Sequence, residues 1–143
     1  WQFMPYTGRR FGLEVGFFLD ERRDPLKATL AASNYLKDLH RRFGSWELAM
    51  AGYNAGEGKI GRAIRRYRTK NFWKIRQGRY LKAETKNYVP KIMALAIIGK
   101  NLKAFGFEKY SAKMSVFKAI RLRVTHGDFC GFILYSTGIC VKN

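Results

Sequence analysis

AGYNAGEG, residues 51–58, places three glycines and an asparagine between two stretches whose apolar residues recur with helical spacing. The simplest interpretation is a tight turn between two helices, in which Gly56 and Gly58 adopt positive φ angles and Tyr53 belongs to the core. The alternative is the wall of a binding site, where small residues let a bulky ligand approach the backbone. Tyr53 and Asn54 would then offer a hydroxyl and an amide to that ligand.

The residues before this turn predict two helices. Asp24 is a good N-cap and Pro25 suits the first helical position, and apolar residues then recur at helical spacing as far as Phe43. Because Gly44 ends that pattern, we expect a helix over residues 25–43. Ser45 is placed to cap a second helix, WELAMAGY (46–53), which ends near the glycines.

The residues after the turn predict three more helices. Ile60, Ala63, Ile64 and Tyr67 recur at i, i+3, i+4 and i+7, and NFWKIRQG (71–78) is expected to form a short helix. ETKNYVPKIMALAIIGKN (84–101) is apolar nearly all round after its proline, which predicts a buried central helix.

Pro90 constrains that last helix. Its ring would clash with the carbonyl group four residues earlier, so the helix either begins near Asn87 or kinks at the proline.

Both ends of the chain are less regular. WQFMPYTGRRFGL (1–13) predicts a short helix from Thr7, with Thr7 as its candidate cap. Apolar residues between Tyr110 and Val124 are compatible with one amphipathic helix, and the last 17 residues, from Gly127, are expected to form a weak strand or a loose tail. The expected fold is therefore mainly α, a single domain of about five to seven helices with an irregular C-terminal tail.

The composition limits the classes of binding partner but does not identify one. With 47% apolar and 15% aromatic residues over 143 positions, the chain is expected to fold rather than to be disordered. Its 28 Lys and Arg against 10 Asp and Glu give a net charge of +18, which favours a polyanion. Nucleic acid, an anionic membrane and an acidic cell-wall polymer all fit this charge.

The cysteines and histidines suggest no bound cofactor. Cys130, Cys140, His40 and His126 lack the spacing of metal ligands, so we expect no metal site and no cofactor. The two cysteines are compatible with a disulfide and equally with two free thiols. The apolar run FCGFILYSTGICV (129–141) is too short and too rich in Gly, Ser and Thr for a membrane span.

Two polar residues outside the turn have competing interpretations. Gln2 is an amide among residues typical of a core, and a buried amide without partners costs about 1–3 kcal/mol, so Gln2 either caps backbone groups or faces a polar ligand. Glu84 precedes the apolar helix, where a carboxylate stabilises the helix dipole; the alternative is a carboxylate that lines a cleft.

Four long segments, in order, resemble the catalytic domain of bacterial lytic murein transglycosylases: WQFMPYTGRRFGL, DERRDPLKATLAASNYLKDLHRRFGSWELAMAGYNAGEGKI, FWKIR and ETKNYVPKIMALAII. The subgroup is the membrane-bound transglycosylase D type, with a soluble-transglycosylase-like, lysozyme-like domain. The resemblance implies a transglycosylase domain lacking its N-terminal part over residues 1–107, and a divergent tail over residues 108–143.

The resemblance also implies an activity. Such enzymes cut the β-1,4 bond between N-acetylmuramic acid and N-acetylglucosamine in peptidoglycan, and the sugar's own C6 hydroxyl attacks C1 to leave a 1,6-anhydro ring. Because the nucleophile belongs to the substrate, one Glu in an apolar pocket serves as acid and then as base, where ordinary glycosidases use two carboxylates. The implied location is the bacterial cell envelope, in the periplasm or peripherally at the outer membrane.

Seven residues match the family's substrate-binding motifs. Gln2, with Phe3 and Met4, matches a cleft segment in which Gln contacts sugar. Tyr53 and Asn54 match the A-Y-N-A-G motif, with the Tyr hydroxyl expected near the catalytic carboxylate and the substrate's acetamido group. Glu84 and Tyr88 match the E-T-x-x-Y-V motif on the far side of the groove. The resemblance thus favours a saccharide-binding wall for residues 51–58 and implies peptidoglycan glycan strands as the partner.

The catalytic Glu is a departure from the family. It is expected in an E-S-x-F-like motif upstream of WQFMP, and Glu14, Glu57 and Glu84 are poor substitutes for it because of where they lie in the sequence. We therefore assign no catalytic residue and expect residues 1–143 alone not to cleave the glycan. A truncated or frameshifted gene would account for both ends of the sequence, and a specialised short form stays open.

Other functions remain as alternatives. A non-catalytic relic of the domain would hold glycan strands without cutting them, and a goose-lysozyme-like hydrolase would give a product one water heavier. A nucleic-acid-binding role is not expected, because no helix-turn-helix, zinc or RNA-binding signature is present. Arg65, Arg66 and their basic neighbours either hold the wall's carboxylates or form a solvated helix face.

Overall fold

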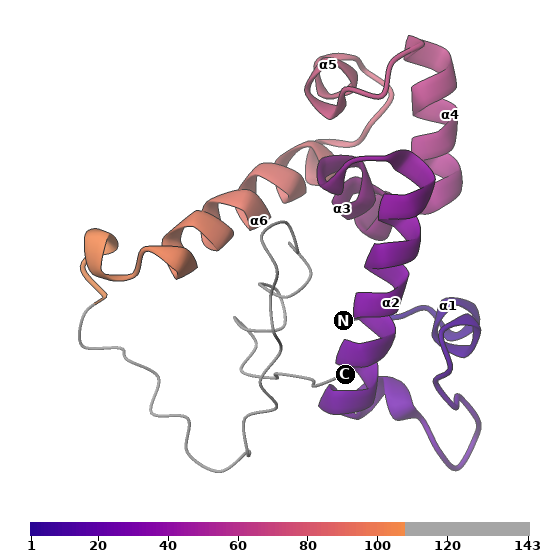
Figure 1. Cartoon of the computed structure of the whole chain (residues 1–143). Helices are drawn as coiled ribbons and strands as arrows, with labels where there is room; N and C mark the ends of the chain where they lie inside the picture. Colours follow the sequence, from indigo (N-terminus) through magenta and orange to yellow (C-terminus); the bar gives the residue numbers. More distant parts are fainter. Residues whose placement is uncertain (108–143) are drawn as a thin grey trace. The chain divides into compact units, whose positions relative to one another are not determined.

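The computed structural model describes residues 1–107, and they are mainly α-helical, as expected (Figure 1). They belong to two compact units, Trp1–Tyr35 and Leu36–Ala112, the second described up to residue 107. The described elements are α1 (Pro5–Arg10), η1 (Glu21–Arg23), α2 (Pro25–Phe43), α3 (Trp46–Ala55), α4 (Glu57–Tyr67), α5 (Phe72–Gln77), α6 (Ala83–Lys100) and η2 (Lys103–Phe105). None of these helices combines the length and the hydropathy that a membrane crossing requires.

The predictions for residues 108–143 lie outside the described residues. They comprise the amphipathic helix between Tyr110 and Val124, the strand or tail from Gly127, the pairing of the cysteines and the apolar run 129–141.

The first unit is built around aromatic side chains. Phe3 and Tyr35 are both 7% exposed, with ring centroids 6.4 Å apart, and Phe11 lies 4.7 Å from Tyr35. Helix α1 begins at Pro5 with Met4 as its N-cap, so the prediction that Thr7 caps this helix is wrong. Because Pro5 fixes its own φ angle near the helical value, the helix starts two residues earlier than expected.

Carboxylates hold the loop between α1 and α2. The Asp20 carboxylate accepts hydrogen bonds from the Arg22 backbone and guanidinium, and the pKa of Asp20 is lowered mainly by that side chain. The Glu21 carboxylate accepts a 2.8 Å bond from the Glu14 amide and pairs with Lys27, so the pKa of Glu21 lies below its ordinary value. The loop thus gains stability from ionised carboxylates.

The starts of helices α2 and α3 match the sequence predictions. Helix α2 spans Pro25–Phe43, and the Asp24 carboxylate accepts bonds from the amides of the first turn at 2.8 and 3.0 Å, as its sequence predicts. Ser45 Oγ accepts the Leu48 amide at 3.2 Å and caps α3. Both predicted caps are confirmed. The largest fully buried side chains of the second unit form its core: Leu39, Leu48, Met50, Ile60, Phe72, Ile75 and Val89.

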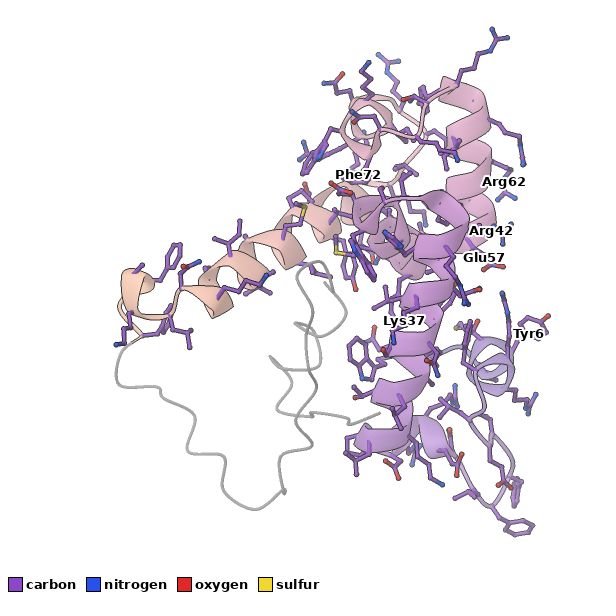
Figure 2. All side chains as sticks on the ribbon, viewed as in Figure 1. Tyr6, Lys37, Arg42, Glu57, Arg62 and Phe72 are labelled. Atoms are coloured by element: carbon purple, nitrogen blue, oxygen red, sulfur yellow. The ribbon has the colours of Figure 1, made fainter. Side chains whose placement is uncertain are left out.

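A single residue separates α3 from α4. Gly56, with φ of 89°, donates to the Gly52 carbonyl at 2.9 Å and its own carbonyl accepts from Lys59 at 3.1 Å, so it caps both helices. A positive φ at Gly56 is confirmed, whereas the same prediction for Gly58 is wrong because Gly58 lies inside α4. The first turn of α4 is tied to α2 by Glu57, whose Oε1 lies 3.2 Å from Arg42 Nη1 (Figure 2).

Helix α6 begins at Ala83, not near Asn87, and carries Pro90 in its interior. Proline has no N–H, so the Lys86 carbonyl four residues earlier loses its helical donor. Arg76 on α5 supplies one: its Nε donates to the Lys86 carbonyl at 2.8 Å. The proline is therefore tolerated because a neighbouring helix satisfies the freed acceptor.

The prediction that α6 is a buried central helix is wrong. Only Thr85, Val89 and Ala96 are buried along its length, while Leu95 and Ile97 are 64% and 56% exposed. Its first turns lie beside α3, and the remainder extends away from α3 (Figure 1). Within residues 1–107, α6 has a packing partner along only part of its length, so its apolar sequence alone does not bury it.

The first prediction concerns the link between Arg76 and α6. We expect Arg76→Leu to lower the free energy of unfolding by about 1–2 kcal/mol, because the Lys86 carbonyl is left without a donor. In a Pro90→Ala background the new amide reaches that carbonyl, so the same change should cost about 1 kcal/mol less. Urea denaturation of the four proteins measures this coupling, and an equal cost in both backgrounds would refute the proposed link.

The second prediction concerns Glu21. Its folded-state pKa lies below the ordinary 4.5, so the contact stabilises the loop fully above that pH and is lost as the pH falls through the lower folded value. The amide proton of Glu14 should shift with pH in NMR spectra, with a midpoint below 4.5, and Glu21→Gln should abolish the shift. A midpoint at or above 4.5 would contradict this account.

Candidate functional site

The last turn of α3 and the first turn of α6 bring together residues that are 30 positions apart in the sequence. Tyr53 and Asn54 lie on α3 because that helix continues to Ala55, and Glu84 lies on α6 because that helix begins at Ala83. The two helices pack against each other. The A-Y-N-A-G and E-T-x-x-Y-V segments thus lie beside each other within the second unit.

The Asn54 side chain joins the two helices. Its Nδ2 donates to Glu84 Oε1 at 3.0 Å, and its Oδ1 accepts from Thr85 Oγ1 at 2.8 Å. The carboxylate fixes the amide orientation, since a reversed amide would place two oxygens against each other. An aspartate at position 54 would set two carboxylates side by side, so the site requires the neutral amide.

Thr85 is a site residue that the sequence reasoning missed. It is 3% exposed, and a buried hydroxyl needs a hydrogen-bond partner, which Asn54 provides. The sequence feature that could have identified Thr85 is its position beside Glu84 in the E-T-x-x-Y-V segment. Buried Thr85 donates a hydrogen bond to the Asn54 side chain, whereas exposed Glu84 accepts one from it.

Two phenols accompany this pair of helices. Tyr53 precedes Asn54 on α3, and Tyr88 follows Glu84 by four residues, so it lies on the same face of α6. Both tyrosines are partly buried, and burial raises the pKa of Tyr88. The Tyr88 hydroxyl therefore keeps its proton at neutral pH and remains able to donate a hydrogen bond.

The chemistry of this site suits an uncharged polar ligand. It combines an amide, a carboxylate and phenols, which together offer both donors and acceptors. The Glu84 carboxylate lies in the first turn of α6, where the helix dipole favours a negative charge. Within residues 1–107 no cluster of three or more His, Cys, Asp or Glu side chains is arranged to hold a metal ion.

The segment Gln2–Phe3–Met4 belongs to the first unit. Gln2 is exposed and has a φ of 52°, which costs a non-glycine residue on the order of 1 kcal/mol, so the idea of a buried amide does not apply to it. Phe3 is in the core and its carbonyl accepts from Arg22 Nη1 at 2.9 Å, while Met4 is 70% exposed. Their sharing of a groove with Asn54 and Glu84 stays a prediction.

Comparison with known proteins gives a consistent result. Residues 1–76 match the family described as "Transglycosylase SLT domain". Over 111 residues the chain is 42% identical to proteins called membrane-bound lytic murein transglycosylase D in Escherichia coli strains K12 and O6:H1 (CFT073), covering 74% of this chain and 24% of each of them. An Alteromonas sp. (strain M-1) protein named for tributyltin chloride resistance is 38% identical over 71 residues, 49% of this chain and 34% of that protein. The chain spans about a quarter of the length of the first two relatives.

The third prediction concerns Thr85. Thr85→Val keeps the shape of the side chain but removes the hydroxyl, so the free energy of unfolding should fall by about 1–2 kcal/mol. The side-chain amide resonances of Asn54 should move in this variant. In Thr85→Ser, which keeps the hydroxyl, they should stay close to their original positions. A Val variant that leaves the Asn54 resonances in place would show that Thr85 does not orient this amide.

Proposed function

This chain belongs to the transglycosylase SLT domain family, and on that basis we propose that it binds peptidoglycan glycan strands as the lytic transglycosylase domain of a cell-wall enzyme. The reaction of that enzyme is cleavage of the β-1,4 bond between N-acetylmuramic acid and N-acetylglucosamine, with formation of 1,6-anhydro-N-acetylmuramic acid. The names of the two Escherichia coli relatives support this substrate and reaction class.

The observation that carries the proposal is the held amide of Asn54. Glycan strands present hydroxyl and acetamido groups, which are neutral donors and acceptors. The Asn54 nitrogen carries two hydrogens, and its bond to Glu84 uses one of them. Thr85 and Glu84 already fix the amide, so its side chain has lost its conformational freedom before a sugar binds. This preorganisation favours tight and oriented binding.

In the proposed reaction a carboxyl group protonates the glycosidic oxygen while the C6 hydroxyl of the muramic acid attacks its own C1. The same group, now a carboxylate, takes the proton of that hydroxyl, so no water is consumed. Glu14 and Glu84 are exposed and Glu57 pairs with Arg42, so none of the three lies in the apolar pocket that this step needs. We therefore give Glu84 a substrate-binding role and expect residues 1–143 alone to bind glycan without cutting it.

The proposed location is the bacterial cell envelope. The relatives are named as membrane-bound murein transglycosylases, and peptidoglycan lies outside the cytoplasm. Peripheral association of this chain with an envelope membrane is part of the proposal.

The fourth prediction tests the proposed site. Asn54→Ala and Glu84→Ala should each weaken binding to purified peptidoglycan strands by about 5- to 30-fold, because each removes one or two hydrogen bonds to the sugar or to the group that orients it. Gln77→Ala removes an exposed amide from α5 and should leave binding unchanged. Isothermal calorimetry with soluble strands measures all three, and equal affinities across the set would reject the site.

The same prediction includes the outcome of an incubation with peptidoglycan. Residues 1–143 should retain intact strands and release no anhydromuropeptides, as judged by mass spectrometry. Release of anhydro products by this chain alone would overturn the purely substrate-binding role of Glu84. It would also overturn the expectation that residues 1–143 do not cleave the glycan. Products one water heavier would identify a hydrolase instead.

A further inference from the structure

The sequence from α4 through the first turn of α6 carries a dense positive charge. Residues 59–86, here called the basic segment, hold 11 of the chain's 28 Lys and Arg and a single acidic residue, Glu84. The eleven are Lys59, Arg62, Arg65, Arg66, Arg68, Lys70, Lys74, Arg76, Arg79, Lys82 and Lys86. This share of the charge greatly exceeds the segment's share of the length.

The basic segment presents these charges on the outside of two helices. Ile60 and Ala63 are buried on α4, while Arg62, Arg65 and Arg66 are exposed. Figure 2 shows Arg62 on the outside of this helix. On α5, Phe72 and Ile75 are buried, whereas Lys74 is exposed. Both helices are thus anchored by apolar side chains and present cations to solvent.

An exposed indole accompanies the cations. Trp73 on α5 is 41% exposed and meets Phe72 edge to face, with ring centroids 5.3 Å apart. It lies between Lys70 and Lys74 in the sequence. Tryptophan beside Lys and Arg is the composition that favours the boundary between lipid headgroups and acyl chains.

The cations of the basic segment are not neutralised within the described residues. Four carboxylates within residues 1–107 form ion pairs, and their cationic partners all lie outside this segment. These carboxylates are Asp20, Glu21, Asp38 and Glu57. Its partnered side chains use neutral groups. Arg62 Nε donates to Tyr80 Oη at 3.1 Å, Arg66 lies over the Tyr80 ring, and Arg76 holds the Lys86 carbonyl.

We propose that the basic segment docks the domain on an anionic phospholipid surface, with α4 and α5 against the headgroups and Trp73 at the interface. This deepens the envelope location given under the proposed function and rests on it. A lipid surface is favoured over the carboxylates of peptidoglycan stems or a nucleic acid because the exposed indole adds an apolar contact that a lipid interface accepts. Each cation near an anionic bilayer strengthens binding about fivefold.

The test uses residues 1–143 with vesicles of phosphatidylglycerol and phosphatidylcholine, analysed by sedimentation. The variant Arg65→Gln/Lys70→Gln/Lys74→Gln should lose about 100-fold in affinity for the anionic vesicles. Its matched control, Arg23→Gln/Lys37→Gln/Lys91→Gln, also replaces three exposed cations and should lose far less. Equal losses in the two triple variants would overturn the proposal, because net charge and not the basic segment would then set the affinity.

Tryptophan fluorescence gives the second readout. Emission should shift to the blue on anionic vesicles, and Trp73→Phe should remove that shift although Trp1 and Trp46 remain. A shift that survives this substitution would overturn the proposed orientation. Loss of binding to peptidoglycan or DNA in the basic-segment variant, with vesicle binding unchanged, would assign the segment to another polyanion. Glycan binding measured in parallel separates this test from that of the Asn54 site, since the basic-segment variants leave that site intact.

Discussion

The backbone conformation of Gly56 is the constraint on which the second unit depends. Its φ of 89° is open to glycine and strained for other residues, and it turns the chain in a single step from α3 into α4. Because no further loop residues are used, Asn54 stays in the last turn of α3 and Glu57 falls in the first turn of α4. The glycine thus sets the position of a site residue on one side and of the Arg42 ion pair on the other.

The first turn of α6 is held from two directions, which explains how an exposed helix can carry a fixed site. Asn54 on α3 bonds to Glu84 and Thr85, and Arg76 on α5 bonds to the Lys86 carbonyl. The second contact exists because Pro90 lacks an amide hydrogen. A residue that would ordinarily weaken the helix therefore frees an acceptor, and that acceptor ties α6 to α5 two residues after Glu84.

The sequence predicts those features that depend on near neighbours along the chain. Asp24 and Ser45 cap their helices as expected, since an N-cap acts within three residues of itself, and the positive φ at Gly56 follows from its place between two helical patterns. The exposure of Leu95, the start of α6 and the role of Thr85 were not predictable in this way. Each depends on a partner on another helix, namely the extent of α3, the Arg76 guanidinium and the Asn54 amide.

The site residues were predicted from family motifs and not from their own chemistry. Taken alone, Glu84 is an ordinary carboxylate in the first turn of a helix, and only its contact with Asn54 distinguishes it. The structure adds a separation of charge that no motif contains. Glu84 and the neutral groups around it form the candidate site, while most cations of α4 and α5 are exposed to solvent. Arg76 belongs to both arrangements, since its charge adds to the basic segment while its Nε supports α6. The two proposed contacts, to a ligand through amide and hydroxyl groups and to a surface through charge, therefore use different side chains of the same unit.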